Sequence, residues 1–368
     1  MKHMNLLKNI LFVFIFTVLG TSLFAQVKYS NEFLAIGVGA NALSMANANV
    51  ATVNDVTAGY WNPAGLLGLK SNLEVSLMHS EYFAGIAKYD YGGIAARIDS
   101  GSVAAFSVIR FGVDNIPNTT QLIDANGNIN YDNITTFSAA DYAFLFSYAK
   151  KSKIPGLNLG GNVKVIRRTV GDFGGAWGFG LDIGAQYEYK KWKFGAMLRD
   201  ATSTFNAWNY TLDDQTKAVF QQTGNQIPTN SVEVTLPTLV LGAAKKYEFK
   251  YKISAMGELD LVTTFDGKRN VLLKSSFASA DPHLGIQIGY NNFIFIRAGV
   301  GNFQTMTDIT GQTVHTIQPN IGLGVRFKAI TLDYALTNIG DATGGLYSNL
   351  FSLKLDINKH PHKSVTAN

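Results

Sequence analysis

Apolar and polar residues alternate with a period of two along most of the chain after residue 72. In 177–189, the odd positions carry Trp, Phe, Leu, Ile, Ala and Tyr, whereas the even positions carry Gly, Asp, Gln and Glu. Segments 317–327, 330–334 and 351–357 repeat this alternation. Successive side chains of a strand point to opposite faces. The pattern therefore predicts strands with one aliphatic and aromatic face and one face of glycine and polar groups.

The alternation predicts fourteen strands. They cover 73–79, 85–97, 102–113, 139–150, 156–168, 175–189, 192–199, 234–247, 251–263, 283–291, 293–301, 315–327, 329–337 and 346–357. Short and long connections alternate between them, apart from marginal cases at 80–84 and 169–174. An even number of strands with this alternation is typical of bacterial outer-membrane barrels, whose short turns face the periplasm. Both chain ends are then expected in the periplasm. Segment 269–278 remains ambiguous, because as a strand it would make the count odd.

Composition supports a membrane barrel over a soluble protein. Charged residues make up 15% of the chain and aromatic residues 12%, while mean hydropathy is only +0.07. Lipid-facing and lumen-facing residues cancel in such an average. A soluble sandwich also alternates, but its outer face seldom carries so much of the glycine seen here, 36 residues in all. We predict an all-β fold, a fourteen-stranded antiparallel transmembrane β-barrel over 72–357 with a small N-terminal helical plug segment.

The first 25 residues have the pattern of a signal peptide. Lys2 and Lys8 precede an apolar run over 10–19, and we expect cleavage before Gln26. No apolar stretch near 18 residues follows, so no membrane-spanning helix is expected after the signal. At the other end, 358–368 is predicted to be a solvated periplasmic tail.

Segment 26–71 is poor in large apolar side chains and is expected to pack inside the barrel as a plug, with a short helix of small residues at 42–51. It contains a motif of six candidate plug residues, Trp61, Asn62, Pro63, Ala64, Gly65 and Leu66. Pro63 favours an extended Asn62, whose side chain can bind its own local backbone. Gly65 permits a positive φ.

Residues on the two faces of the strands are expected to tolerate different substitutions. Leu181, Ile183, Val325 and Leu353 are expected to face lipid, whereas Asp182, Arg326 and Lys354 face the lumen and are expected to tolerate polar exchange. Aromatic residues near strand ends fit interfacial girdles, namely Trp177, Tyr187, Tyr189, Trp192, Tyr290 and Phe327.

No catalytic or cofactor-binding constellation stands out. The chain has no cysteine, its six histidines are scattered, and it lacks a Gly-x-Ser-x-Gly elbow. Segment 124–132 resembles the start of a calcium loop, but Ile129 occupies the position of the required glycine, which favours a polar hairpin tip. We expect no metal, no cofactor and no enzyme activity. The net charge of +5 is too small and too dispersed to indicate nucleic-acid binding.

The block 37–66, with Gly37-Val-Gly-Ala, Met45 and Trp61-Asn-Pro-Ala-Gly-Leu66, resembles the N-terminal signature of the PorV/PorQ family of FadL-like outer-membrane barrels. Segment 283–299 resembles a late barrel region of the same family. Asn41 stands where the family has Arg, and Ser44 and Ala46 stand where it has Gly. These departures indicate a divergent paralogue.

The resemblance implies two functions. PorV-like members carry secreted cargo from the type IX translocon to a surface attachment complex, which is our first hypothesis. Its partners would be the translocon, the cargo, the attachment proteins and outer-membrane lipid. FadL-like members move hydrophobic small molecules across the outer membrane, which is the alternative; a barrel enzyme is a third class that no residue requires.

A secretion shuttle needs binding residues at its outer mouth, and the long loops 114–138 and 200–233 are the expected places. They offer a polar surface with a few aromatic anchors. The candidate partner-binding residues are Asn126, Asn128, Trp208, Tyr210 and Phe220.

Overall fold

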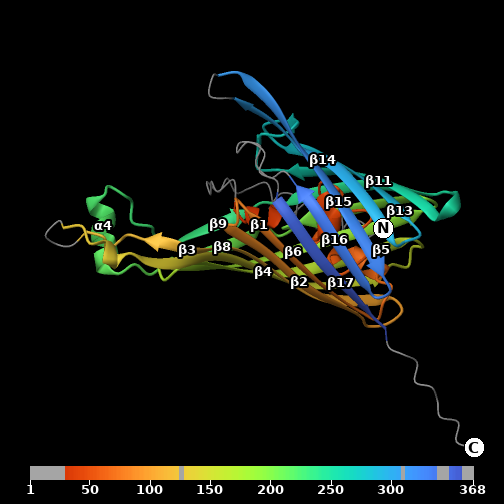
Figure 1. Ribbon diagram of the computed structural model, residues 1–368, viewed down its shortest axis with the longest axis horizontal. Coiled ribbons are helices and arrows are strands. Elements are labelled where there is room, and N and C mark those ends of the chain that lie inside the picture. The colour runs from red at the N-terminus through yellow and green to blue at the C-terminus, as the bar shows by residue number, and fades with distance from the viewer. Residues whose placement is uncertain (1–29, 124–127, 308–310, 338–347, 359–368) are drawn as a thin grey trace, which may run out of the picture.

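The computed structural model describes residues 30–123, 128–307, 311–337 and 348–358. Its strands form a closed antiparallel ring of fourteen, in the order β1 to β7, β10, β11, β13 to β17 and back to β1 (Figure 1). The ring strands are β1 Leu73–Tyr82, β2 Ala87–Arg97, β3 Ser102–Asn118, β4 Thr135–Lys151, β5 Leu157–Val170, β6 Gly174–Tyr189, β7 Trp192–Arg199, β10 Thr238–Glu248, β11 Ile253–Thr264, β13 Ser279–Tyr290, β14 Ile294–Thr307, β15 Thr313–Phe327, β16 Ile330–Thr337 and β17 Ser348–Ile357. The predicted fourteen-stranded barrel is confirmed.

Three further strands lie outside the ring. β8 Thr204–Tyr210 pairs with the first half of β6, and β9 Ser231–Thr235 pairs with β8. β12 Leu273–Lys274 is two residues long and pairs with β13, which resolves the ambiguity at 269–278 in favour of a loop that leaves the ring even-numbered. The sequence pattern missed β8 and β9, since the whole stretch 200–233 was predicted to be a loop.

The outer face of the ring is apolar, as the alternation predicted. Ile183, Val325 and Leu353 are exposed, whereas Asp182 and Lys354 are buried on the opposite face. Leu181 and Arg326 are half-buried. The six predicted girdle aromatics are all exposed on the outer face. An apolar exterior around a closed ring suits lipid, because a closed ring leaves no unpaired strand edge in the bilayer.

The connections divide the barrel into two ends. We call the end with the turns 98–101, 152–156, 190–191, 249–252, 291–293 and 328–329 the short-turn end, and the opposite end the long-loop end. At the long-loop end β3, β4 and the helix α4 (Asp214–Gln222) project far beyond the ring (Figure 1). The other short helical elements outside the N-terminal segment are η3 Tyr131–Asn133 and η4 Lys250–Lys252. No helix among the described residues is long and apolar enough to span a membrane.

Residues 30–71, here called the N-terminal segment, lie inside the ring (Figure 1). The segment contains four short helices, η1 Glu32–Ala35, α2 Ala40–Ser44, α3 Ala58–Trp61 and η2 Pro63–Gly68. α2 is shorter and earlier than the helix predicted at 42–51. It ends because Ala46 and Asn47 take positive φ values of 52° and 69°, a left-handed conformation that no helix continues through.

The glycines of the inner wall make room for the N-terminal segment. A Cβ added at Gly299 would lie 2.2 Å from the carbonyl carbon of Met45, and one at Gly195 would lie 2.4 Å from the carbonyl oxygen of Val50. A Cβ added at Gly160 would lie 2.5 Å from the carbonyl carbon of Pro63. The glycine on the polar face of the strands therefore reflects direct backbone packing between wall and segment.

The two ends of the described chain lie at opposite ends of the barrel. Ser30 contacts Glu233 of β9 and Asn206 of β8, at the long-loop end. Asn358 contacts Asn72 at the short-turn end. Both chain ends themselves lie outside the described residues, so the expectation that they share the periplasmic side stays a prediction. The predicted signal peptide 1–25 and most of the predicted tail 358–368 lie outside the described residues.

Candidate functional site

A cavity of about 1790 Å³ opens in the long-loop half of the lumen. Its sides come from the loop-end parts of β7, β10, β11 and β13 to β16, and from the connections 200–203, 236–237 and 265–276. Its floor is the N-terminal segment, through residues 30–36 and 43–50 and the pair Tyr60 and Trp61. The cavity is therefore bounded below by the segment that fills the rest of the ring.

One side of the cavity is apolar. Val240 of β10 and Val262 of β11 point inward and pack with Val50 of the floor. Above them lie further apolar cavity-lining residues, Val234, Leu236, Pro237, Phe265 and Val271. An apolar wall in a lumen that is otherwise polar suits a ligand with an apolar body.

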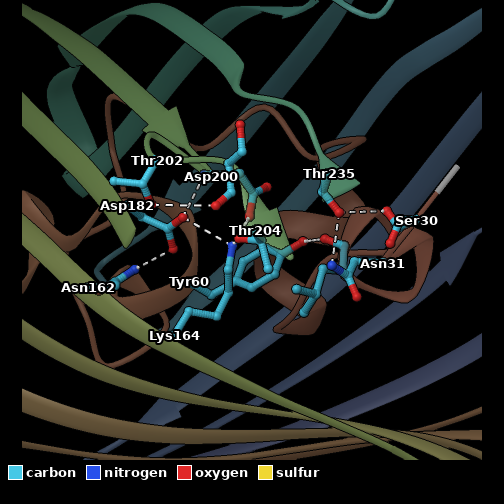
Figure 2. A network of polar contacts seen from close by, with 12 residues as sticks. Ser30, Asn31, Tyr60, Asn162, Lys164, Asp182, Asp200, Thr202, Thr204 and Thr235 are labelled. Carbon is cyan, nitrogen blue, oxygen red and sulfur yellow. Dashed lines mark hydrogen bonds and ion pairs between the residues drawn. The ribbon is translucent and has the colours of Figure 1, made fainter. Parts of the chain in front are cut away.

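A buried ionic network lies beside this apolar wall, on β5 and β6, which only β7 separates from β10 (Figure 2). Lys164 Nζ lies 3.1 Å from Asp182 Oδ1 and 2.5 Å from Asp200 Oδ1. The backbone N–H of Asp200 donates to Asp182 over 2.8 Å, and the Thr204 hydroxyl donates to Asp200. A single ammonium thus joins β5, β6 and Asp200 of the connection after β7, and Asp200 in turn accepts from the first residue of β8. Buried charges of this kind are retained only when each is paired and hydrogen-bonded, as these are.

The network continues to the start of the N-terminal segment (Figure 2). Asn206 Nδ2 donates to Ser30 Oγ and Asn31 Oδ1, both over 3.0 Å. Asn31 Nδ2 donates to Thr235 Oγ1 over 2.9 Å, and Ser30 Oγ donates to Glu233 Oε2 over 3.1 Å. β8 and β9 therefore hold the first described residues at the cavity rim.

Arg199 lines the cavity between this network and the motif. Its guanidinium carbon lies 4.7 Å from the Tyr60 ring centroid and 5.4 Å from the Trp61 ring centroid. Among the described residues Arg199 forms no ion pair with a carboxylate, and its buried Nε has no hydrogen-bond partner. Burial raises the pKa of Tyr60, so the phenol stays protonated and donates to the carbonyl of Leu34. Arg199 is therefore a cation held by aromatic faces rather than by an acid.

The motif residues fix the segment against the wall. Asn62 is extended, with φ −164° and ψ 103°, and its Oδ1 accepts from Ala64 N, as predicted. Its Nδ2 also donates 3.0 Å bonds to the carbonyls of Val50 and Ala185. The Trp61 indole donates to the Val38 carbonyl over 2.9 Å. The Asn62 side chain thus links two parts of the N-terminal segment and also attaches the segment to β6.

Gly65 is required for a reason other than the predicted one. Its φ is not positive, but a Cβ there would lie 2.4 Å from the carbonyl oxygen of Val53. Pro63 and Ala64 pack on the wall glycine Gly160, and Leu66 is fully buried. The motif is therefore a packing element of the lumen, and we retain its plug role as a proposal.

Wall carboxylates hold the floor of the cavity. Asp260 Oδ2 accepts from the backbone N–H groups of Asn49 and Val50, over 2.8 and 2.9 Å. Glu258 Oε1 accepts from Ala51 N over 2.7 Å, and its second oxygen accepts from the Thr52 hydroxyl. Four consecutive residues of the segment are thereby anchored to β11.

A second anchor lies nearer the short-turn end. Lys354 Nζ lies 2.8 Å from Asp55 Oδ2 in a buried ion pair. Burial alone would raise the pKa of Asp55, but the Lys354 ammonium and two bonds from Thr57 outweigh it and hold that pKa below its usual value. These contacts, and those of Asp182, argue against the tolerance to polar exchange that was predicted for residues 182 and 354.

The predicted partner-binding residues are spread over the projecting part of the barrel. We call residues 114–138 and 204–235 the arm. Asn128 is exposed near the β3–β4 tip, and Phe220 is half-buried on α4. Trp208 is buried, stacked 5.6 Å from Tyr210, with the guanidinium of Arg168 5.0 Å above it. Trp208 is therefore a packing residue of β8 rather than an exposed anchor, and Asn126 lies outside the described residues.

The pattern analysis missed the cavity residues, although a signal was present. Val240 and Val262 interrupt the alternation with apolar side chains at lumen-facing positions, in Leu239-Val-Leu241 and Leu261-Val262. An apolar residue on the polar face of a membrane strand marks contact with a plug or a ligand. Arg199, Lys164 and Asp200 gave no such signal, because each is a single polar residue on a face where polar residues are expected.

No protein-family model matches the chain, and no curated protein matches it. Solved structures do match it. CymD, a monoaromatic hydrocarbon channel, gives a TM-score of 0.55 over 89% of this chain and 99% of its own, at 14% identity. The toluene transporters TodX of P. putida and TbuX of Ralstonia pickettii give 0.52 and 0.51, each at 12% identity over 88% of this chain and 99% of theirs. At these identities the similarity shows the fold alone, the β-barrel that this chain shares with these proteins.

Proposed function

We propose that this protein admits small, largely apolar molecules into the long-loop cavity and passes them across the bacterial outer membrane. The observation that carries the proposal is the apolar side of the cavity, formed by Val240, Val262 and Phe265 directly above the N-terminal segment. A concave site with an apolar wall and few convergent polar groups is the usual form of a small-molecule site. This is the alternative implied by the family resemblance rather than the first hypothesis.

The polar side of the cavity supports a further detail of the ligand. Arg199 offers a guanidinium that no carboxylate among the described residues occupies. A hydrogen-bond acceptor on an otherwise apolar molecule would therefore lie toward Arg199, with its apolar body against Val262. The molecule would continue only when residues 46–52 move, because these residues close the lumen below and are held by Glu258 and Asp260.

The solved structures that match the fold support the same proposal. CymD is described as a monoaromatic hydrocarbon channel, and TodX and TbuX as toluene transporters. Each of them is matched over nearly its whole length by this chain. A toluene-sized aromatic hydrocarbon is therefore the first ligand to test.

The test is uptake of labelled toluene by vesicles that contain the purified barrel. We expect the double substitution Val262→Gln and Phe265→Gln to slow protein-dependent uptake by about tenfold, because amides placed on the wall lose apolar contact worth ~1–2 kcal/mol. Val232→Gln is the matched control, since Val232 is exposed on the arm and does not line the cavity. Wild-type uptake no faster than that of protein-free vesicles would refute the proposal.

A second candidate is docking of secreted protein at the arm, as the PorV-like hypothesis requires. The arm favours it, because β3 and β4 each run 17 residues and continue beyond the ring. Ile129 and Tyr131 lie exposed near its tip. Replacement of 119–134 by a tight turn tests this candidate. Loss of secreted-protein attachment with unchanged toluene uptake would favour docking; the converse favours transport.

A further inference from the structure

Lysines gather on one side of the short-turn end, in three turns that follow one another around the ring. The turns join β4 to β5, β6 to β7 and β10 to β11, and they are neighbours because β5 pairs with β6 and β7 pairs with β10. We call the lysines of these turns and of the adjoining strand ends the basic arc. They are Lys150, Lys151, Lys153, Lys190, Lys191, Lys193, Lys245, Lys246, Lys250 and Lys252.

The positive charge of the basic arc is not balanced by the protein. Lys193 pairs with Glu188 over 3.9 Å, and Lys246 pairs with Glu248 over 3.1 Å. The other eight lysines form no ion pair with a carboxylate among the described residues. Most cations at the long-loop end differ: Lys88, Arg110, Arg168, Lys217 and Arg269 each have a carboxylate partner, whereas Arg167 contacts the Trp177 ring instead. Cations without a carboxylate partner are thus concentrated at the short-turn end among the described residues.

The basic arc is interleaved with exposed aromatic rings. Lys245 Nζ lies 4.7 Å from the Trp192 ring and 5.0 Å from the Tyr247 ring. Lys190 Nζ lies 5.1 Å from the Tyr189 ring. Trp and Tyr rings on a barrel exterior mark the height of the lipid headgroups. These ammonium groups are therefore held at the level where lipid phosphates lie.

We propose that the basic arc binds the phosphates of anionic phospholipids in the leaflet around the short-turn end. The proposal is independent of what passes through the lumen. Charge complementarity favours lipid. Lysines without an ion pair would contact the anionic headgroups, and the neighbouring aromatic rings of the lipid-facing wall would contact the apolar chains beneath them. An acidic protein would be expected to meet lysines without the adjoining apolar rings, and it is the competing outcome of the test.

The test measures the selectivity of the folded barrel for spin-labelled phosphatidylglycerol over phosphatidylcholine in reconstituted membranes. Wild-type protein should favour phosphatidylglycerol by about fivefold in low salt, the effect of roughly one lysine at the headgroup surface. In about 0.5 M NaCl the preference should fall toward one, because the interaction is screened. Wild-type protein without any preference in low salt would overturn the proposal.

Three matched variants separate charge from structure. The triple substitution Lys190→Gln, Lys245→Gln and Lys250→Gln should weaken the preference, because it removes three of the eight lysines that form no ion pair among the described residues. The same positions changed to Arg should keep the preference. The control triple Lys88→Gln, Lys217→Gln and Lys268→Gln, at the long-loop end, should also keep it. Heat-modifiable migration in gels verifies that each barrel is folded.

Two results would contradict the proposal. One is equal loss of the preference in the control triple. The other is tight, salt-sensitive binding of polyglutamate by detergent-solubilised protein that shows no lipid preference, which would assign the basic arc to an acidic protein. If the Gln triple does not fold, the salt dependence of the wild type and the Arg triple still decide between these outcomes.

Discussion

At the scale of single residues, the contacts between wall and N-terminal segment leave almost no free space. Gly299 and Gly285 accept the backbone and side chain of Met45 at distances where no Cβ fits. Asn62 uses its amide to bind both the segment and β6. Two lumen-facing glycines and one amide thus hold the segment in one position, and substitutions there have large predicted effects.

Gly299→Ala should displace the segment from the wall. The new Cβ would lie 2.2 Å from a Met45 backbone atom, and overpacking of this kind costs about 1–3 kcal/mol. We expect a lower free energy of unfolding in denaturant and faster proteolysis between residues 40 and 66. Gly257→Ala is the control, because nothing lies within 4 Å of its Cβ position. Equal behaviour of the two variants would contradict the packing described here.

Lys354→Met should destabilise the barrel by about 3–5 kcal/mol, since it leaves the Asp55 carboxylate buried without its partner. The double variant with Asp55→Leu should recover most of this loss, because both charges are then removed. Denaturant titration at pH 7 measures both. Because the pKa of Asp55 is lowered in the folded state, the stability from its pair is present above its unfolded pKa and is lost as pH falls through its folded pKa. A double variant no more stable than Lys354→Met would contradict the pairing.

At the scale of elements, the strands obey the alternation of the sequence closely. β17 shows why: Leu353 lies beside Leu77 of β1 and Leu332 of β16, and all three are exposed on the outer face. Ser352 and Lys354 between them face the lumen. The lipid and the segment therefore impose opposite requirements on successive residues.

Leu353→Arg tests this register. A cation on the lipid face near the middle of a strand costs about 2–4 kcal/mol. We expect slower folding into vesicles and a lower unfolding midpoint, measured by the gel shift of the heat-modified form. Leu353→Phe should fold normally, because it keeps an apolar side chain on the same face. Normal stability of Leu353→Arg would show that the face is not in lipid.

The strands could be predicted from the sequence because each strand shows the alternation of apolar and polar residues within its own segment. What the sequence did not predict depends on contacts between distant segments. The sequence pattern does not mark β8 as a strand. It places Trp208 on a loop surface, whereas in the structure Trp208 is buried against Arg168 and Tyr210. The predicted helix at 42–51 was wrong because Ala46 and Asn47 adopt left-handed conformations, which end α2. The apolar side of the cavity forms where Val50, Val240 and Val262 come into contact. Their positions in the sequence do not indicate this contact.

At the scale of the whole molecule, the barrel has two different halves. The long-loop half holds the cavity, and the apolar and charged parts of its lining lie on neighbouring strands, β10 and β11 beside β5 to β7. The short-turn half is filled by that segment and ends in the basic arc. A molecule entering from the loops would meet the cavity first and the anchored residues 46–52 next. Transport therefore depends on binding above the segment before any movement of it.

Photolabelling with a small diazirine-bearing aromatic hydrocarbon tests this account most directly. The folded protein is irradiated with the probe, and the modified residues are mapped by mass spectrometry. We predict labels on 234–240, 262–271 and 34–50, suppressed by excess toluene and reduced in the variant with Val262→Gln and Phe265→Gln. Labels confined to the lipid-facing wall or to the arm, unaffected by toluene, would contradict the account.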